Sequence, residues 1–230
     1  EYCYNILVSG LDDDNGGSDT NILVRFDVPN KRIDLVSLPR PTLLHNDYRN
    51  NNPHFAYAKG GTELLMEQIE NLLGIPVDFY VTVNLKGFIA LVDQIDGVDF
   101  DIPINMDYDD PYQDLHIHFT KGPRHLNGQE AMEVVRFRHN NDGTGYGTED
   151  IGRIGTQQAF LKAVAKQLLQ IGNVKNIPAL VDIFYTYVKT DLTTGNLVWL
   201  GNEALNIGTE NIHFATLPGD GSGYYNKQSG

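Results

Sequence analysis

Residues 62–102 read TELLMEQIENLLGIPVDFYVTVNLKGFIALVDQIDGVDFDI, a stretch that alternates between the hydrophobic patterns of a helix and of a strand. Its apolar residues first recur every three or four positions, which predicts a helix over residues 62–73 that Gly74 and Pro76 end. The rest predicts, in order, a strand over 77–83, a helix over 86–95 and a strand over 98–102. This alternation is typical of α/β proteins, so we expect a mixed central β-sheet with helices on both faces.

The flanking sequence extends the same pattern. Further strands are predicted over 4–10, 21–28, 32–38, 115–119 and 212–217, with Pro29-Asn30-Lys31 as a hairpin turn. Further helices are predicted from about Asn127 to Val134 and over 156–171, 177–188 and 194–205. Since there is no internal repeat or long linker, we expect one domain over residues 1–217 and a flexible tail over 218–230.

Composition narrows the function classes. The 230 residues are 41% hydrophobic and carry a net charge of −13, which argues against a generic binder of nucleic acid or of anionic membranes. No apolar run approaches the roughly 20 residues that span a bilayer. The chain begins at Glu1 rather than Met, as expected where an N-terminal signal or anchor has been removed. The sole cysteine, Cys3, excludes an internal disulfide.

Arginines cluster in one part of this acidic chain. Three of the eight lie at Arg136, Arg138 and Arg153. Guanidinium groups match phosphate oxygens two at a time, so this cluster indicates an anion site; pairing with nearby carboxylates is the alternative. Because Arg136 and Arg138 would share a face only in extended backbone, we predict a strand there, with Phe137 pointing into the core.

Two other groups have the side chains of metal ligands. Asp12, Asp13, Asp14 and Asp19 follow the first strand, where carboxylates suit Mg²⁺, although a solvated acidic turn is the alternative. His116 and His118 share a strand face with a spacing compatible with zinc, provided that His139 or an Asp completes the set. Walker, dinucleotide-binding and nucleophile-elbow motifs are absent from the sequence.

The helix predicted over residues 156–171 is apolar around most of its circumference, apart from Lys162, Lys166 and Gln170. Such a surface belongs either to a packed core or to the wall of a lipid pocket, and the periodicity alone leaves both open.

A series of distinctive blocks runs in order over about residues 4–170. They include Asn5-Ile-Leu-Val-Ser-Gly-Leu-Asp12, Ser18-Asp19-Thr20, Leu35-Val-Ser-Leu-Pro-Arg40, Phe55-Ala-Tyr-Ala-Lys-Gly-Gly61, Asp93-Gln-Ile-Asp-Gly-Val98, Leu115-His-Ile-His118, Gly122-Pro-Arg-His-Leu-Asn-Gly-Gln-Glu-Ala131, Val135-Arg-Phe-Arg-His139 and Asp150-Ile-Gly-Arg153. In this order the blocks resemble the LytR-CpsA-Psr family.

The resemblance implies an outward-facing protein of a Gram-positive bacterium, held by an N-terminal membrane anchor outside this chain. Members transfer glycopolymers such as wall teichoic acid or capsule from a polyprenyl-pyrophosphate carrier to peptidoglycan. By the same resemblance Asp12 and Asp19 hold Mg²⁺, Gln157 contacts the head group, and the lipid lies in an apolar tunnel between sheet and helices. The implied pyrophosphate ligands are the arginines at positions 40, 136, 138 and 153.

The sequence departs from the family pattern at charged positions. The family's Asp-x-Arg is Asp12-Asp13-Asp14 here, its Pro-Arg-Asp-Thr is Pro39-Arg40-Pro41-Thr42, its Lys-Ile-Asn is Asn52-Pro53-His54, and an arginine after Arg153 is Thr156. Lys59, Arg124 and His54 are the substitutes we expect for the lost cations. The departures also open an alternative function, a catalytically impaired protein of the same fold that binds polyprenyl phosphate or glycan.

Overall fold

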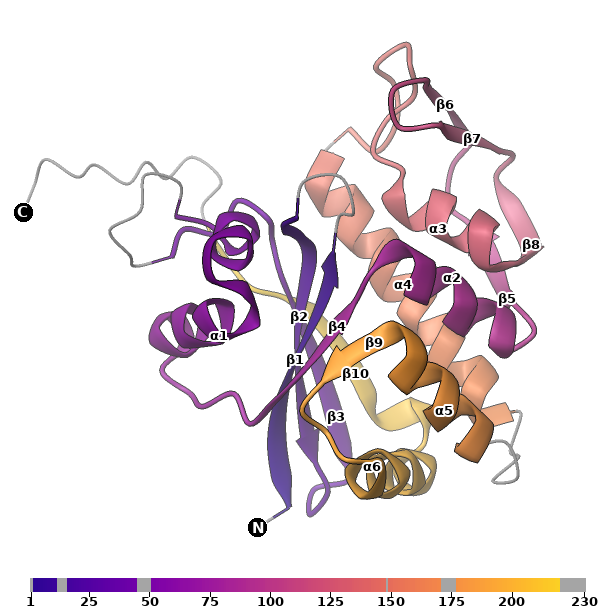
Figure 1. The fold of residues 1–230 in the computed structure, drawn as a ribbon. Helices are drawn as coiled ribbons and strands as arrows, with labels where there is room; N and C mark the ends of the chain where they lie inside the picture. The colour runs from indigo at the N-terminus through magenta and orange to yellow at the C-terminus, as the bar shows by residue number, and fades with distance from the viewer. Residues whose placement is uncertain (1, 12–15, 45–50, 148, 171–176, 220–230) are drawn as a thin grey trace, which may run out of the picture.

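A computed structural model describes residues 2–11, 16–44, 51–147, 149–170 and 177–219. Within these ranges, six strands form a central sheet in the order β10-β3-β2-β1-β4-β9 (Figure 1). The strands are β1 (Cys3–Leu11), β2 (Ser18–Asp27), β3 (Arg32–Leu38), β4 (Phe79–Val83), β9 (Val188–Thr190) and β10 (Ile212–Thr216). The β1–β2, β2–β3 and β4–β9 pairs are antiparallel, whereas β1–β4 and β3–β10 are parallel, so the predicted mixed sheet is confirmed.

Helices cover both faces of this sheet. On one face Leu7 and Leu23 are buried together with Leu65 and Ile69 of α1 (Pro53–Leu73). On the opposite face Phe26 and Ile33 pack against Ile207 of α6 (Thr194–Ile207). The sequence therefore predicted the layered α/β class correctly.

The helix predicted to start at Thr62 begins nine residues earlier in the structure, at Pro53. Asn52 caps it by accepting a hydrogen bond from the Phe55 amide, and Pro53 suits a first helical turn. Gly61 interrupts the helix with φ 65° and ψ −155°, so Thr62 starts its second segment. The sequence prediction recognised only that second segment.

A lobe of helices and two small two-stranded sheets lies beside the central sheet (Figure 1). It has its own core, built around Ile117, Phe137 and Phe160, which is separate from the core under α1. The lobe elements are α2 (Leu85–Gln94), β5 (Val98–Ile102), β6 (Met106–Asp110), β7 (Leu115–Phe119), β8 (Gly122–Leu126), α3 (Gly128–Arg136), α4 (Glu149–Gln170) and α5 (Ile177–Tyr187). The pairs are β5–β8 and β6–β7, both antiparallel; the sequence analysis missed β6 and β8.

The predicted strand over Arg136–Arg138 is wrong. Helix α3 continues to Arg136, and the chain leaves the helix at Phe137, which has φ −58° and ψ 135°. Phe137 is nevertheless buried in the lobe core, as predicted. The helix starts as the sequence indicated, because Asn127 accepts from the Glu130 amide at 2.9 Å and Glu130 accepts from the Asn127 amide at 3.1 Å.

Helix α4 also begins earlier than predicted, at Glu149 rather than Thr156, so Arg153 lies on a helix. Gly152 permits this because a Cβ there would stand 2.2 Å from the Cβ of Tyr146. Tertiary packing thus overrides the poor helix propensity of a glycine-rich segment. None of the helices in the described part of the chain combines the length and hydropathy needed to cross a bilayer. Most of the tail predicted to be flexible, from residue 220 on, lies outside the described residues.

Candidate functional site: an arginine-lined apolar cavity

A cavity of about 380 Å³ lies between the sheet and the lobe. Alternate residues of β1 and β2 form its floor: Val8 pairs with Ile22 and Gly10 with Thr20, so all four residues lie on one face of the sheet. The walls come from α2, α3, α4 and the β6–β7 hairpin, and most are apolar. The apolar wall residues include Leu85, Phe88, Leu115, Met132, Val135, Phe160 and Leu161.

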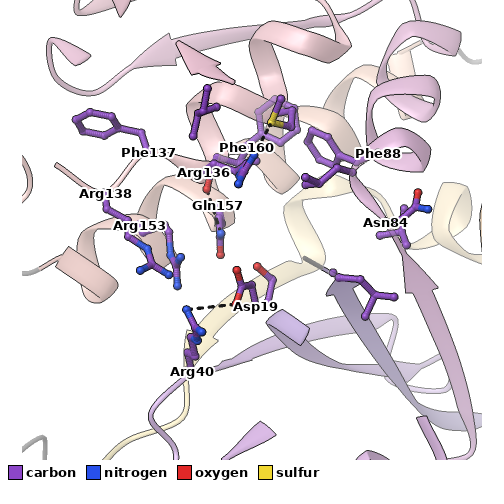
Figure 2. A pocket seen from close by; sticks show the side chains of 18 of the residues that line it. Asp19, Arg40, Asn84, Phe88, Arg136, Phe137, Arg138, Arg153, Gln157 and Phe160 are labelled. Atoms are coloured by element: carbon purple, nitrogen blue, oxygen red, sulfur yellow. Dashed lines mark hydrogen bonds and ion pairs between the residues drawn. The ribbon is translucent and has the colours of Figure 1, made fainter. Parts of the chain in front are cut away.

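Four arginines from separate segments line this one cavity. Arg40 follows β3, Arg136 ends α3, Arg138 comes two residues later, and Arg153 lies on α4. In Figure 2 the side chains of Arg40, Arg138, Arg153 and Gln157 point toward the space beside Asp19, while Phe88 and Phe160 line another part. One region of the cavity therefore gathers three guanidinium groups around Asp19, while most of the remaining wall is apolar.

The spacing along α4 explains two of these positions. Arg153 and Gln157 are four residues apart, so they lie on the same face of the helix, one turn from each other. Arg153 is only 6% exposed, which holds its charge at the base of the cavity rather than in bulk solvent. The Gln157 side-chain amide donates to the Val135 carbonyl at 3.2 Å, which fixes its position against α3.

Asp19 is the acidic residue of the cavity, and a β-bulge places it there. Gly10 pairs with Thr20 but Leu11 pairs with Ser18, so Asp19 is an extra residue in β2. Its Oδ1 lies 3.4 Å from Nη1 of Arg40 and 3.2 Å from Nδ1 of His54. This oxygen is shielded from solvent and, among the described residues, accepts no hydrogen bond of normal geometry.

His54 is 5% exposed, and its ring lies against Gly17, the residue before β2. A Cβ on Gly17 would stand 2.3 Å from the His54 ring, so glycine is required for this close approach. His54 is one of the residues predicted to replace a lost cation, and its ring lies against the Asp19 carboxylate. Asp12, which is predicted to bind Mg²⁺ together with Asp19, lies outside the described residues, as do Asp13 and Asp14.

Two predicted substrate-binding residues do not line the cavity. Lys59 is exposed on α1, which covers the opposite face of the sheet. Arg124 lies on β8, where its Nη2 donates to Glu130 Oε1 at 2.5 Å and its guanidinium sits 5.1 Å from the centre of the Phe119 ring.

At Thr156, where the family pattern has an arginine, the structure shows a neutral contact instead. Thr156 is buried, and its hydroxyl donates to the Tyr146 hydroxyl at 2.7 Å. Burial raises the pKa of Tyr146, so this contact stays uncharged near neutral pH.

Gln113 is a cavity residue that the sequence analysis missed. It lies in the turn of the β6–β7 hairpin, and its Oε1 accepts from Nη2 of Arg136 at 2.6 Å. Met132 Sδ lies 3.9 Å from the same guanidinium. A lone glutamine in a turn gives no sequence signal, because its role depends on how the hairpin docks onto α3.

Comparisons with known proteins identify the family of this chain. A family model, the LytR_cpsA_psr family, matches residues 2–229. The chain is 33% identical over 199 residues to the polyisoprenyl-teichoic acid–peptidoglycan teichoic acid transferase TagV of Bacillus subtilis, covering 82% of this chain and 50% of TagV. It is 32% identical to TagU of Bacillus cereus, covering 94% of this chain and 69% of that protein.

Solved structures show the same fold. The crystal structure of B. subtilis TagV superimposes with a TM-score of 0.79 at 30% identity, covering 95% of this chain and 85% of that one. A structure of TagT bound to LI-WTA has a TM-score of 0.73 at 22% identity, covering 95% of this chain and 79% of the other, and supports the fold alone. The chain spans half the length of the curated TagV relative. With its fold, its cavity and the family match over residues 2–229, the chain belongs to the LytR_cpsA_psr family.

Proposed function

We propose that this domain transfers a glycopolymer from a polyprenyl-pyrophosphate carrier to peptidoglycan on the outer side of the cytoplasmic membrane. One observation carries the proposal: Arg40, Arg138 and Arg153 point with Gln157 into one region of a largely apolar cavity, whose wall also includes a fourth arginine, Arg136. A pyrophosphate joined to an isoprenoid has the same division into an anionic head and an apolar tail. The transferase names of the relatives TagV and TagU support this substrate class.

The arginines bind the pyrophosphate and the apolar walls bind the tail. Each charge-assisted hydrogen bond from a guanidinium contributes about 1.5–3 kcal/mol. A volume of about 380 Å³ lies at the lower end of the range for ligand pockets, so it accommodates the head group and the start of the tail. The remainder of a long polyprenyl chain would extend along the apolar side of α4, which forms the tunnel in this proposal.

The proposed reaction is a phosphoryl transfer. A peptidoglycan sugar hydroxyl attacks the phosphorus that bears the glycan, forming a new P–O bond. The bond to the second phosphate breaks, and polyprenyl phosphate leaves. Arg136, Arg138 and Arg153 stabilise the charge that develops on the phosphate oxygens. Asp14, a candidate base for the hydroxyl proton, lies outside the described residues.

Mg²⁺ fits this site in our proposal because Asp19 Oδ1 is a buried carboxylate oxygen without a hydrogen bond of normal geometry among the described residues. Such an oxygen is a suitable ligand for a hard divalent cation. When bound, the ion would supply charge neutralisation at the phosphate oxygens. Asp12 would be the second ligand, and removal of Mg²⁺ with a chelator should abolish turnover that added Mg²⁺ restores.

The proposal is tested with purified protein, lipid-linked glycan, peptidoglycan and Mg²⁺. Arg136→Ala removes one electrostatic donor and should lower turnover by about 10²–10³-fold. The matched control is Arg32→Ala, an exposed arginine at the other end of the sheet that pairs with Asp34 at 2.7 Å. Wild-type turnover in Arg136→Ala would contradict the mechanism.

The alternative function is a binding protein of the same fold without turnover. The Thr156–Tyr146 contact favours it, because a neutral pair stands where the family pattern has an arginine. Native mass spectrometry of protein purified from bacteria detects a retained polyprenyl phosphate. Retained lipid with no turnover in the transfer assay would support the binding protein over the enzyme. The membrane anchor and the outward location are part of the same proposal, and they concern chain outside this sequence.

A further inference from the structure

The outer face of the β6–β7 hairpin carries a row of histidines and aspartates. Antiparallel pairing places Asp107 opposite His118 and Asp109 opposite His116. These four side chains share the face that points away from the cavity, since Tyr108 and Leu115 on the other face line it. All four are at least half exposed.

Three of these residues form a group with the geometry of metal ligands. One ligand atom each from Asp109, His116 and His118 can be chosen so that all lie within 4.8 Å of one another. Asp109 Oδ1 lies 2.5 Å from Nδ1 of His116 and 3.2 Å from Nε2 of His118. Zinc–ligand bonds of about 2.1 Å in a tetrahedral site separate ligand atoms by roughly 3.4 Å. Small rotations of exposed side chains therefore produce the required arrangement.

The remaining ring nitrogens each face a different carboxylate. His118 presents Nδ1 to Asp107 Oδ1 at 2.8 Å, and His116 presents Nε2 to Asp114 Oδ1 at 3.5 Å. Histidine ligands of zinc commonly donate their second N–H to a carboxylate, which fixes the tautomer and raises the basicity of the coordinating nitrogen. The hairpin thus supplies both the ligands and the groups that orient them.

We propose that Asp109, His116 and His118 bind a divalent transition-metal ion of the Zn²⁺ class. Two imidazoles favour such an ion over Mg²⁺, which prefers oxygen ligands. Three protein ligands leave a fourth position for water or for a group from another molecule. His139, suggested from the sequence as a possible third ligand, lies instead along the cavity and against Tyr108.

The site is separate from the proposed Mg²⁺ site but connected to the cavity wall. Asn141 donates to the Asp109 carbonyl at 3.0 Å, and the Asp109 amide donates back to Asn141 Oδ1 at 2.6 Å. Asn141 lies shortly after Arg138, so the segment that carries this arginine is docked on the metal-binding hairpin. An ion that joins β6 to β7 would therefore also stabilise this wall of the cavity.

Zinc binding is measured by isothermal titration calorimetry on protein stripped with a chelator. The expected result is one equivalent bound at micromolar zinc, weakened at least about 100-fold in His116→Gln and in His118→Gln. Asp107→Asn removes only an orienting group and should weaken binding by about 10–100-fold.

The matched control is His125→Gln. His125 is an exposed histidine 2.7 Å from Asp99, and within the described part of the chain this pair belongs to no group of three potential metal ligands. This variant should bind zinc like the wild type, and circular dichroism without zinc checks that every variant is folded. Failure of the wild type to bind zinc, or zinc binding by His116→Gln and His118→Gln that is as tight as that of the wild type, would overturn the proposal. The measurement needs no lipid substrate, so its outcome is independent of the transfer assay.

Discussion

The two faces of β1 and β2 present neighbouring residues to different surroundings. Leu7 and Leu23 face α1, and both are almost completely buried in a closed core. Val8 and Ile22, next to them in the sequence, face the lobe and line the cavity. The same pair of strands therefore builds a packed layer on one side and the floor of a cavity on the other.

The difference arises from what covers each face. Helix α1 has no core of its own, so it buries Leu65 and Ile69 directly against the sheet. The lobe already buries Phe137 among its own elements, so its helices can pack on one another without filling the space above β1. A cavity persists where a covering layer is stable without complete contact with the sheet.

The largest loss of stability is expected when a cavity is opened on the closed face. Leu65 is fully buried, so Leu65→Ala should lower the free energy of unfolding by about 2–5 kcal/mol. Denaturant unfolding monitored by circular dichroism measures the loss. A change below that range would show that the α1 face is less tightly packed than its burial indicates.

The same substitution at two adjacent positions of β1 tests the difference in packing between the two faces. Leu7→Phe adds volume to a closed core and should cost about 1–3 kcal/mol in stability. Val8→Phe adds the same ring on the cavity side, where space is available, and should cost less. It should nevertheless reduce the amount of polyprenyl phosphate retained, because the new ring occupies the cavity. Equal stability losses in the two variants would contradict the proposed difference between the faces.

The smallest expected effect is a pH dependence confined to the lobe. The hydrogen bond from His125 to the Asp99 carboxylate raises the pKa of His125. Its contribution to stability is complete below the unfolded-state pKa of about 6.5 and is lost as pH rises through the raised folded-state value. NMR titration of the ring protons measures that pKa directly.

The matched measurement is the Tm difference between wild type and His125→Gln. This difference should be positive at pH 6 and shrink as the pH rises above the raised pKa. A difference that is constant with pH would exclude the contribution of this ion pair.

Much of the fold follows from local sequence. The alternation over residues 62–102, the capping box at Asn127 and the turn at Pro29-Asn30-Lys31 each report a local preference, and each is confirmed. The helix boundaries that were predicted wrongly lie where tertiary contacts override local conformational preference. The start of α4 depends on the contact of Gly152 with Tyr146, and Arg136 lies on a helix although its spacing from Arg138 suggested a strand.

The sequence by itself determined the α/β class, because the class follows from hydrophobic periodicity. It also determined the family and the identity of the arginines that line the cavity, because these follow from ordered motifs. Only the tertiary structure decided that Gln113 holds Arg136 and that Asp109 joins His116 and His118. The physical reason is that periodicity records which side of an element is buried. It does not record which distant element covers that side, or whether the two layers meet without a gap.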